Sequence, residues 1–189
     1  LVFGDSDDTF ATNRIDESLA ILESADIAIN DLNLYHEGKV YEHNYLSKRV
    51  EHLSEINPVF VREKNILGLS NTAVNVSKLP KVAFEKDLEI VDWYYFAYLI
   101  ESGLKAVFTC KTTTNYRQHD RNTVGLDSGS RGKLARTLRV REKQYQLLAK
   151  HFEAYTPLLT DTRERLHTDR LPQKTLLGPQ SDFPLWWEL

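Results

Sequence analysis

The amino-acid sequence predicts an α/β fold, in which a mixed sheet is flanked by helices and followed by a C-terminal helical extension. Three observations predict it. The first 30 residues run from an apolar segment through a helical periodicity to a second apolar segment, the pattern of a strand–helix–strand unit. Residues 86–103 carry a strong helical periodicity directly before a β-rich segment at 106–116. Residues 133–154 then form a long amphipathic helix.

Composition sets the broad class of the protein. The chain has 189 residues, of which 41% are hydrophobic and 27% charged, with a net charge of -3. This is the composition of a globular domain with a core and an appendage, and its near-neutral charge gives no sign of a nucleic-acid partner. The single cysteine, Cys110, excludes a disulfide framework and agrees with a reducing, cytoplasmic compartment. No apolar run approaches the roughly 20 residues of a membrane span.

The first ten residues, LVFGDSDDTF, join an apolar strand end to three carboxylates. Alternation along an extended chain places Asp5 and Asp7 on one side and Asp8 on the other. Two such carboxylates repel each other unless a cation lies between them, and Mg²⁺ or Mn²⁺ prefers oxygen ligands. Asp, Ser and Thr also form turns and helix caps, so these residues alone leave metal chemistry and a plain acidic turn open. Because a buried strand rarely begins a protein, we expect further residues to precede Leu1.

The elements that follow can be taken in order. A helix is predicted at 12–23, with Thr12 as its N-cap and apolar residues at helical spacing, and a strand at 25–30. Residues 31–58 are polar, with Gly38 marking a hairpin turn. The histidines of this segment match no metal-binding spacing and are expected on the surface: His36, His43 and His52.

The second half begins with a small-residue turn and a short apolar alternation within residues 65–80. The helix at 86–103 is predicted to bury one stripe and to end at Gly103. A glycine-bearing polar loop is expected at 117–132. The basic first half of the helix at 133–154 suits either an anionic membrane surface or, as we favour, the solvated face of a docking helix. Aromatic residues are expected to anchor the tail onto the domain: Phe183, Trp186 and Trp187.

Two further stretches contain candidate functional residues. Asp92 lies near the start of the predicted helix beside Trp93, where the helix N-terminus favours its ionised form and aromatic burial raises its pKa. That combination suits a general base, although a carboxylate that only complements the helix dipole is the simpler interpretation. At the end of the strand at 106–116, Arg117 could meet phosphates and His119 could ligate a metal.

The order of these pieces resembles the family 2 glycosyltransferases, inverting enzymes with the Rossmann-like GT-A fold. Four stretches carry the resemblance across residues 1–125: FGDSDDTFATNRI, NILGLSNTAV, EIVDWYYFAYLIESG and YRQHDRNTVG. The strand–helix repeats that hold the nucleotide base in that family are absent from this sequence. The resemblance therefore implies that residues 1–130 form the acceptor and metal side of a GT-A domain, and residues 131–189 a helical extension.

The resemblance also implies roles for individual residues. Asp7 would ligate Mg²⁺ or Mn²⁺ at the donor diphosphate, and Asp5 would contact the ribose or the metal's water shell. Asp92 would take the proton of the acceptor hydroxyl. His119 would be an additional metal or diphosphate contact, with Arg117 beside it.

The implied partners follow from the family. The donor would be a UDP-, GDP- or TDP-sugar, and the acceptor a glycan, a lipid-linked molecule or a small molecule. The setting would be polysaccharide synthesis in the cytoplasm, at the inner face of the membrane. Peripheral membrane association and homo-oligomer formation stay open.

Alternative functions remain at this stage. Residues 5–9 also satisfy the Asp-x-Asp-x-Thr pattern of haloacid-dehalogenase-like phosphatases, with Asp5 as nucleophile and Asp7 as acid. That class needs a late acidic pair, and the downstream aspartates are isolated. A calcium loop lacks the glycine that an EF-hand requires. A non-catalytic GT-A binding module is the third alternative.

Overall fold

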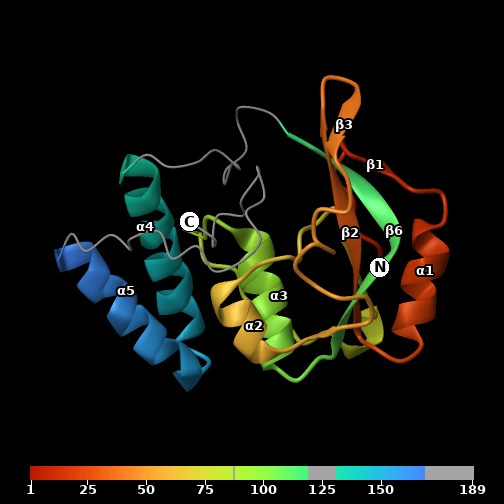
Figure 1. Cartoon of the computed structure of the whole chain (residues 1–189). Helices are drawn as coiled ribbons and strands as arrows, with labels where there is room; N and C mark the ends of the chain where they lie inside the picture. Colours follow the sequence, from red (N-terminus) through yellow and green to blue (C-terminus); the bar gives the residue numbers. More distant parts are fainter. Residues whose placement is uncertain (87, 119–130, 169–189) are drawn as a thin grey trace. The chain divides into compact units, whose positions relative to one another are not determined.

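The computed structural model describes residues 1–86, 88–118 and 131–168 (Figure 1). The chain divides into two compact units, one formed by Leu1–Val82 and Tyr95–Asn122 and the other by Ala83–Tyr94 and Thr123–Leu189. Within the described residues, no helix is both long enough and apolar enough to cross a membrane. Several predictions fall outside the described residues, and these concern His119, most of the loop at 117–132, and the aromatic tail with Phe183, Trp186 and Trp187.

The first unit is built on one mixed sheet. Its strands are β1 (Thr9–Phe10), β2 (Ile27–His36), β3 (Lys39–Glu42), β4 (Glu55–Ile56), β5 (Thr72–Val74) and β6 (Ala106–Arg117). The long strands β2 and β6 lie parallel at its centre, with β5 and β3 antiparallel to β2, and β4 and β1 antiparallel to β6. Residues 1–3 pair antiparallel with β5, because Phe3 N donates to Thr72 O at 3.1 Å. The predicted α/β class with a mixed sheet is confirmed.

Strand β2 is longer than the sequence predicted, because it continues through polar residues beyond Asn30. Asp31 is fully buried and accepts a hydrogen bond from the Ser47 hydroxyl at 2.6 Å. Asn33 donates to Asn115 Oδ1 on β6 at 2.9 Å. Such polar side chains are typical of loops in a sequence, but here their hydrogen-bonding groups find partners on other segments of the first unit.

The β2–β3 hairpin confirms the predicted turn at Gly38, whose φ of 85° lies in the region that favours glycine. His36, His43 and His52 are exposed, as predicted. Among the described residues, no group of three or more His, Cys, Asp and Glu side chains is placed to hold a metal ion.

Helix α1 (Arg14–Leu22) covers one face of the sheet (Figure 1). The prediction of Thr12 as its N-cap is wrong, because the capping position is Asn13, whose side chain makes no cap hydrogen bond. Asn13 instead donates through Nδ2 to Lys111 O at 3.1 Å, where β6 bulges out of register with β2. The Asn13 side chain therefore joins the start of α1 to strand β6 instead of capping the helix.

The buried face of α1 is polar. Arg14 and Ser18 are only 4% and 3% exposed, whereas Ile15 and Leu19 are 59% and 56% exposed. The reason lies in the sheet, since β2 presents Asn30 to this face and Arg14 Nε donates to Asn30 Oδ1 at 2.9 Å. The helical periodicity of the apolar residues therefore identifies the helix but not the face that it buries.

The opposite face of the sheet is covered by α2 (Pro58–Glu63) and the part of α3 (Val91–Glu101) that belongs to this unit (Figure 1). A double hydrogen bond joins the two helices, from Arg62 to the Glu101 carboxylate at 2.7 and 3.1 Å. The predicted stripe of α3 is buried, with Phe96, Ala97 and Ile100 at most 2% exposed. The helix begins later than predicted, at Val91. A short 3₁₀ turn, η1 (Val76–Lys78), follows β5.

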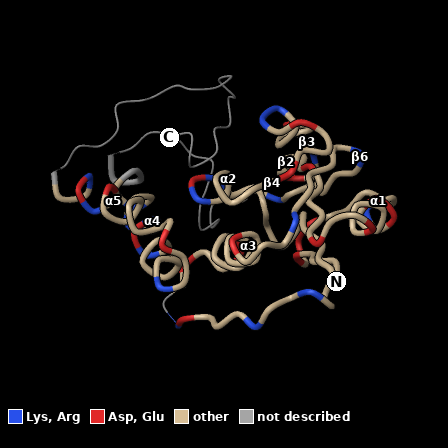
Figure 2. The backbone as a smooth tube through the Cα atoms, turned by 90° about the horizontal axis from the view of Figure 1, so that it is seen from below, with Lys and Arg blue, Asp and Glu red and all other residues tan. Residues whose placement is uncertain are grey.

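The second unit is helical, with α4 (Arg131–Leu148), η2 (Glu153–Tyr155) and α5 (Thr156–Thr168). Helix α4 buries Leu138, Tyr145 and Leu148, each at most 3% exposed, and the Tyr145 ring packs edge-on against Trp93. Figure 2 shows basic and acidic residues interspersed along α4 and α5. One ion pair joins Glu142 of α4 to Arg163 of α5 at 2.9 Å. The burial of its apolar side is what the docking-helix interpretation of α4 expects.

Candidate functional site

The acidic turn, residues 5–8, lies in the first unit between the segment paired with β5 and strand β1. Asp8 N donates to Asp5 O at 3.4 Å, which closes the turn. Asp5 N donates to Ser70 Oγ at 3.0 Å, so the small-residue loop before β5 holds the turn from outside. Asp5 is exposed, Asp7 half-buried and Asp8 only 9% exposed. Because these residues form a turn, the strand alternation used to orient their side chains does not apply.

Asp8 connects the acidic turn to the end of β6. Its Oδ1 accepts a hydrogen bond from Arg117 N at 2.7 Å, across 109 positions of sequence. Its Oδ2 is buried and has no hydrogen bond of ordinary geometry with the described residues. Asp8 therefore directs its side chain to β6 and takes no part in capping α1, whose capping position is Asn13.

Electrostatics around Asp8 favour its neutral form more than usual. Burial raises the pKa of its carboxyl above the ordinary value of 3.8, and the negative charges of Asp7 and Asp5 raise it further. The Arg117 N–H and, more weakly, the Ser70 hydroxyl favour the charged form and oppose this shift. A carboxylate kept in such a place is a cost to the fold, which points to a use other than stability.

Arg117 stands where the parallel strands β2 and β6 end together. Its guanidinium lies 5.8 Å from the centre of the Tyr35 ring, and the side chain is exposed. Gln118 N donates to Tyr35 O at 2.8 Å, so the two strand ends are held side by side. In open α/β sheets, ligands bind at the carboxyl ends of parallel strands. The acidic turn and Arg117 thus meet where the two central strands end, which is the place where ligands bind in such sheets.

Asp92 belongs to the second unit. It lies in the first turn of α3, as predicted, and its Oδ1 accepts a hydrogen bond from Trp93 N at 2.7 Å. It is half-buried, while Trp93 is 1% exposed. Its location at a helix N-terminus beside aromatic bulk is confirmed, whereas its pairing with Asp5 and Asp7 across the two units stays a prediction.

Of the residues predicted for the site, the first unit brings Asp5, Asp7 and Arg117 to the same edge of the sheet, while His119 is not among the described residues. Comparison with protein-family models, curated proteins and solved structures finds no match. The glycosyltransferase resemblance therefore rests on the sequence stretches that carry it and stays a prediction.

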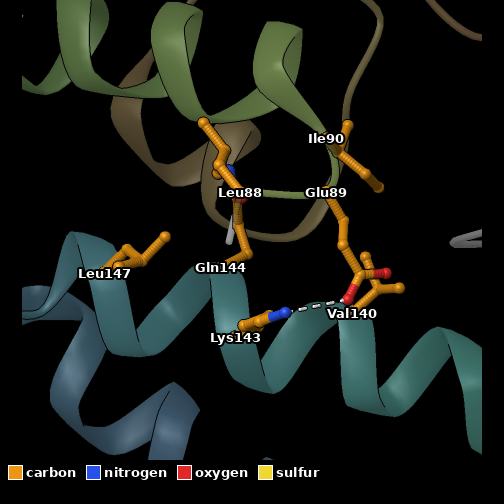
Figure 3. Close-up of a pocket in the computed structure, with 7 residues that line it drawn as sticks. All are labelled: Leu88, Glu89, Ile90, Val140, Lys143, Gln144 and Leu147. Atoms are coloured by element: carbon orange, nitrogen blue, oxygen red, sulfur yellow. Dashed lines mark hydrogen bonds and ion pairs between the residues drawn. The ribbon is translucent and has the colours of Figure 1, made fainter. Parts of the chain in front are cut away.

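A concave region lies within the second unit, between residues 88–90 and α4 (Figure 3). It is lined by Leu88, Glu89, Ile90, Val140, Lys143, Gln144 and Leu147. Lys143 pairs with Glu89 at 3.2 Å beside it, and the buried Gln144 Nε2 has no partner among the described residues. It leaves no room for a water molecule. It is a packing gap, and no ligand is assigned to it.

Sequence reasoning did not predict how two residues near the acidic turn are buried, Asp8 and Arg14. The signal for Asp8 was weak, because its orientation depends on a turn that pairs it with a strand more than 100 positions away. The burial of Arg14 carried no signal in its own helix, since it lies on the side of α1 away from the apolar residues, where a charged side chain would ordinarily be solvated. Only the polar character of the facing strand could have indicated its burial.

Proposed function

We propose that this chain forms the metal and acceptor side of an inverting glycosyltransferase, which moves a sugar from a nucleoside-diphosphate donor to an acceptor hydroxyl. The donor would be a UDP-, GDP- or TDP-sugar, and Mg²⁺ or Mn²⁺ the metal. The product would belong to polysaccharide or glycan synthesis.

One observation carries the proposal, the convergence of three of the four stretches on which the resemblance rests. Asp5 N meets the Ser70 hydroxyl of the NILGLSNTAV stretch at 3.0 Å, and Asp8 accepts from Arg117 N of the YRQH stretch at 2.7 Å. These contacts join positions that are 65 and 109 residues apart in the chain. A shared site explains why such distant motifs meet at one turn.

The carboxylate oxygens of the acidic turn are suitable ligands for Mg²⁺ or Mn²⁺. Asp5 is exposed and Asp7 half-buried, so both offer carboxylate oxygens, the ligands these ions prefer. Mg²⁺ is commonly held by one or two carboxylates together with substrate phosphates, so a pair of aspartates suffices with a diphosphate donor. When bound, the ion supplies Lewis-acid stabilisation of the negative charge on the leaving diphosphate.

The chain's own residues have distinct roles in this proposal. Asp7 would hold the metal ion at the donor diphosphate, and Asp5 would contact the ribose or the water shell of the ion. The exposed Arg117 would add positive charge near the diphosphate. Asp92 takes the proton of the acceptor hydroxyl as that oxygen attacks the anomeric carbon from the face opposite the diphosphate. A single displacement with one base inverts the configuration at that carbon. The transition state carries oxocarbenium character, as in glycoside hydrolysis.

The test is release of nucleoside diphosphate from a panel of UDP-, GDP- and TDP-sugars by the natural full-length protein with Mn²⁺. We expect release from at least one donor, its loss in Asp7→Asn, and its retention in Asp16→Asn, which alters an exposed carboxylate of α1 outside the acidic turn. Absence of both release and Mn²⁺-dependent donor binding would refute the proposal.

The same samples separate the alternative functions. Hydrolysis of p-nitrophenyl phosphate that is lost in Asp5→Asn would indicate a phosphatase instead. Donor binding that needs Mn²⁺ but leads to no transfer would indicate a binding module that keeps the fold without turnover.

A further inference from the structure

The buried guanidinium of Arg14 is the most unusual charge in the first unit. Arg14 is 4% exposed on the face of α1 that packs on the sheet, although the same helix displays Ile15 and Leu19 to solvent. Burying a cation is costly, and apolar residues of similar size often serve a core as well or better. Packing alone therefore does not account for an arginine at this position.

The contacts of Arg14 lie on both sides of the acidic turn. Nη2 donates to Phe3 O at 2.6 Å, two residues before Asp5. The guanidinium lies 4.5 Å from the centre of the Phe10 ring, two residues after Asp8. Arg14 thus holds the chain where it enters the turn and where it leaves it.

Phe10 itself closes the base of the turn. A Cβ atom on Gly4 would lie 2.9 Å from Phe10 Cζ, so the ring lies directly against the backbone of that glycine. The Phe10 ring is therefore held between the Gly4 backbone and the Arg14 guanidinium. Phe3, two residues before the acidic turn, and Phe10, two residues after it, therefore both contact the Arg14 side chain of α1.

A chain of buried hydrogen bonds leads from Arg14 to the turn by a second route. Arg14 Nε donates to Asn30 Oδ1 at 2.9 Å, and Asn30 Nδ2 donates to Thr114 Oγ1 at 3.1 Å. Thr114 Oγ1 donates to Ser70 O at 2.8 Å, and the Ser70 hydroxyl accepts from Asp5 N at 3.0 Å. The network therefore returns to the backbone of Asp5, the first residue of the turn.

The charge of Arg14 has no contacting counterion among the described residues, because its hydrogen bonds go to a carbonyl and an amide oxygen. Burial lowers the pKa of its guanidinium, and the charge of Asp8 opposes that shift. An arginine stays protonated in either case. Its charge thus acts on the Asp8 carboxylate from behind the turn.

We infer that Arg14 is a positioning residue of the proposed donor site, which fixes both ends of the acidic turn through Phe3 and Phe10 and places a positive charge near Asp8, so that Asp5 and Asp7 are preorganised for a divalent cation. This inference rests on the proposed function. It gives a role to Arg14, a residue to which the family resemblance assigns none. Groups that orient metal ligands from behind typically change metal affinity about 10- to 100-fold when they are replaced.

The test measures binding of Mn²⁺ alone, by the relaxation of water protons, in the wild-type protein and three variants. Arg14→Gln removes the charge, Arg14→Lys keeps the charge but reaches fewer of the acceptors, and Ser18→Ala alters an equally buried residue one turn along α1 that lies outside the network. We expect Mn²⁺ affinity to fall at least about tenfold in Arg14→Gln. A smaller fall is expected in Arg14→Lys, and no change in Ser18→Ala.

The outcomes separate the inference from the proposed function. If the wild-type protein binds no Mn²⁺ by itself, the acidic turn is not preorganised for the cation and the inference is overturned, while the proposed function is still decided by the release of nucleoside diphosphate. If the wild type binds Mn²⁺ and both Arg14 variants bind it equally well, only the inference is overturned. If Arg14→Gln does not fold, Arg14→Lys decides, since reduced affinity at unchanged circular dichroism supports positioning and wild-type affinity overturns it.

Discussion

Replacement of Asp8 by asparagine separates the stability of the fold from the needs of the site. The carboxylate is 9% exposed, and only Oδ1 has a good partner, Arg117 N at 2.7 Å. Asparagine keeps an oxygen acceptor for that N–H. It also removes the buried charge that burial and the neighbouring Asp5 and Asp7 make unfavourable. The change therefore removes one favourable and one unfavourable contribution to the free energy of unfolding.

The magnitudes nearly cancel. A hydrogen bond to a charged group contributes about 1.5–3 kcal/mol and a neutral one about 0.5–1.5 kcal/mol, so Asp8→Asn loses about 1 kcal/mol at Arg117 N. A buried acceptor without a partner costs about 1–3 kcal/mol, and the cost is larger when the acceptor is charged. We expect Asp8→Asn to leave the free energy of unfolding within about 1 kcal/mol of the wild type. Asp8→Ala leaves Arg117 N unpaired and should cost about 1–3 kcal/mol.

The assay is urea unfolding at pH 7, combined with amide hydrogen exchange at Arg117, which reports directly on the bond to Asp8. A matched control is Asp31→Asn, because Asp31 is equally buried but fully used. Asp31 accepts from Leu32 N and Leu46 N at 2.8 Å each and from the Ser47 hydroxyl at 2.6 Å. Loss of charge assistance on several bonds should cost about 2 kcal/mol or more. A cost above about 2 kcal/mol for Asp8→Asn would show that Asp8 is kept for stability.

Three further predictions concern other residues. Asp92→Asn should lower sugar transfer about 10²- to 10⁴-fold with donor KM unchanged, measured by steady-state kinetics, and wild-type transfer would remove Asp92 from the mechanism. The ammonium group of Lys78 holds the pKa of Asp26 below 3.8, so Asp26→Asn should be about 1 kcal/mol less stable at pH 7. That difference in stability should shrink as the pH falls below 3.8, because protonation of Asp26 removes its ion pair with Lys78 in the wild type. Thermal unfolding at several pH values measures the difference, and a difference that stays constant with pH contradicts the prediction. Gly4→Ala should displace the Phe10 ring and cost about 1 kcal/mol in urea unfolding, and a neutral result would show that the ring adjusts freely.

The sequence predicts the regular elements of this fold where hydrophobic periodicity is strong. The stripe of α3 and the β-rich segment of β6 follow directly from spacing and composition. The polar half of β2 could not be predicted, because Asp31 and Asn33 resemble loop residues until their partners on other segments are known. The length of a strand with buried polar residues depends on tertiary hydrogen bonds.

The candidate site shows the same limit. The sequence identifies three candidate site residues, because each lies at the end of an apolar or β-rich segment: Asp5, Asp7 and Arg117. The orientation of Asp8 was not identifiable, because it requires knowledge of the turn at residues 5–8 and of its partner on β6. The burial of Arg14 was hidden for a related reason, since a helix periodicity does not reveal that the facing strand presents an amide.

The distant contacts of the acidic turn have a consequence for the order in which the protein folds. The turn lies at the start of this sequence, but Ser70 and Arg117 follow 65 and 109 positions after the residues they hold. Closing loops of that length costs entropy before any contact compensates for it, and such pairings slow folding. A nascent chain that ends before β6 has no partner for Asp8 and no Thr114 for Asn30. The proposed donor site can therefore be completed only after the last central strand has joined the sheet.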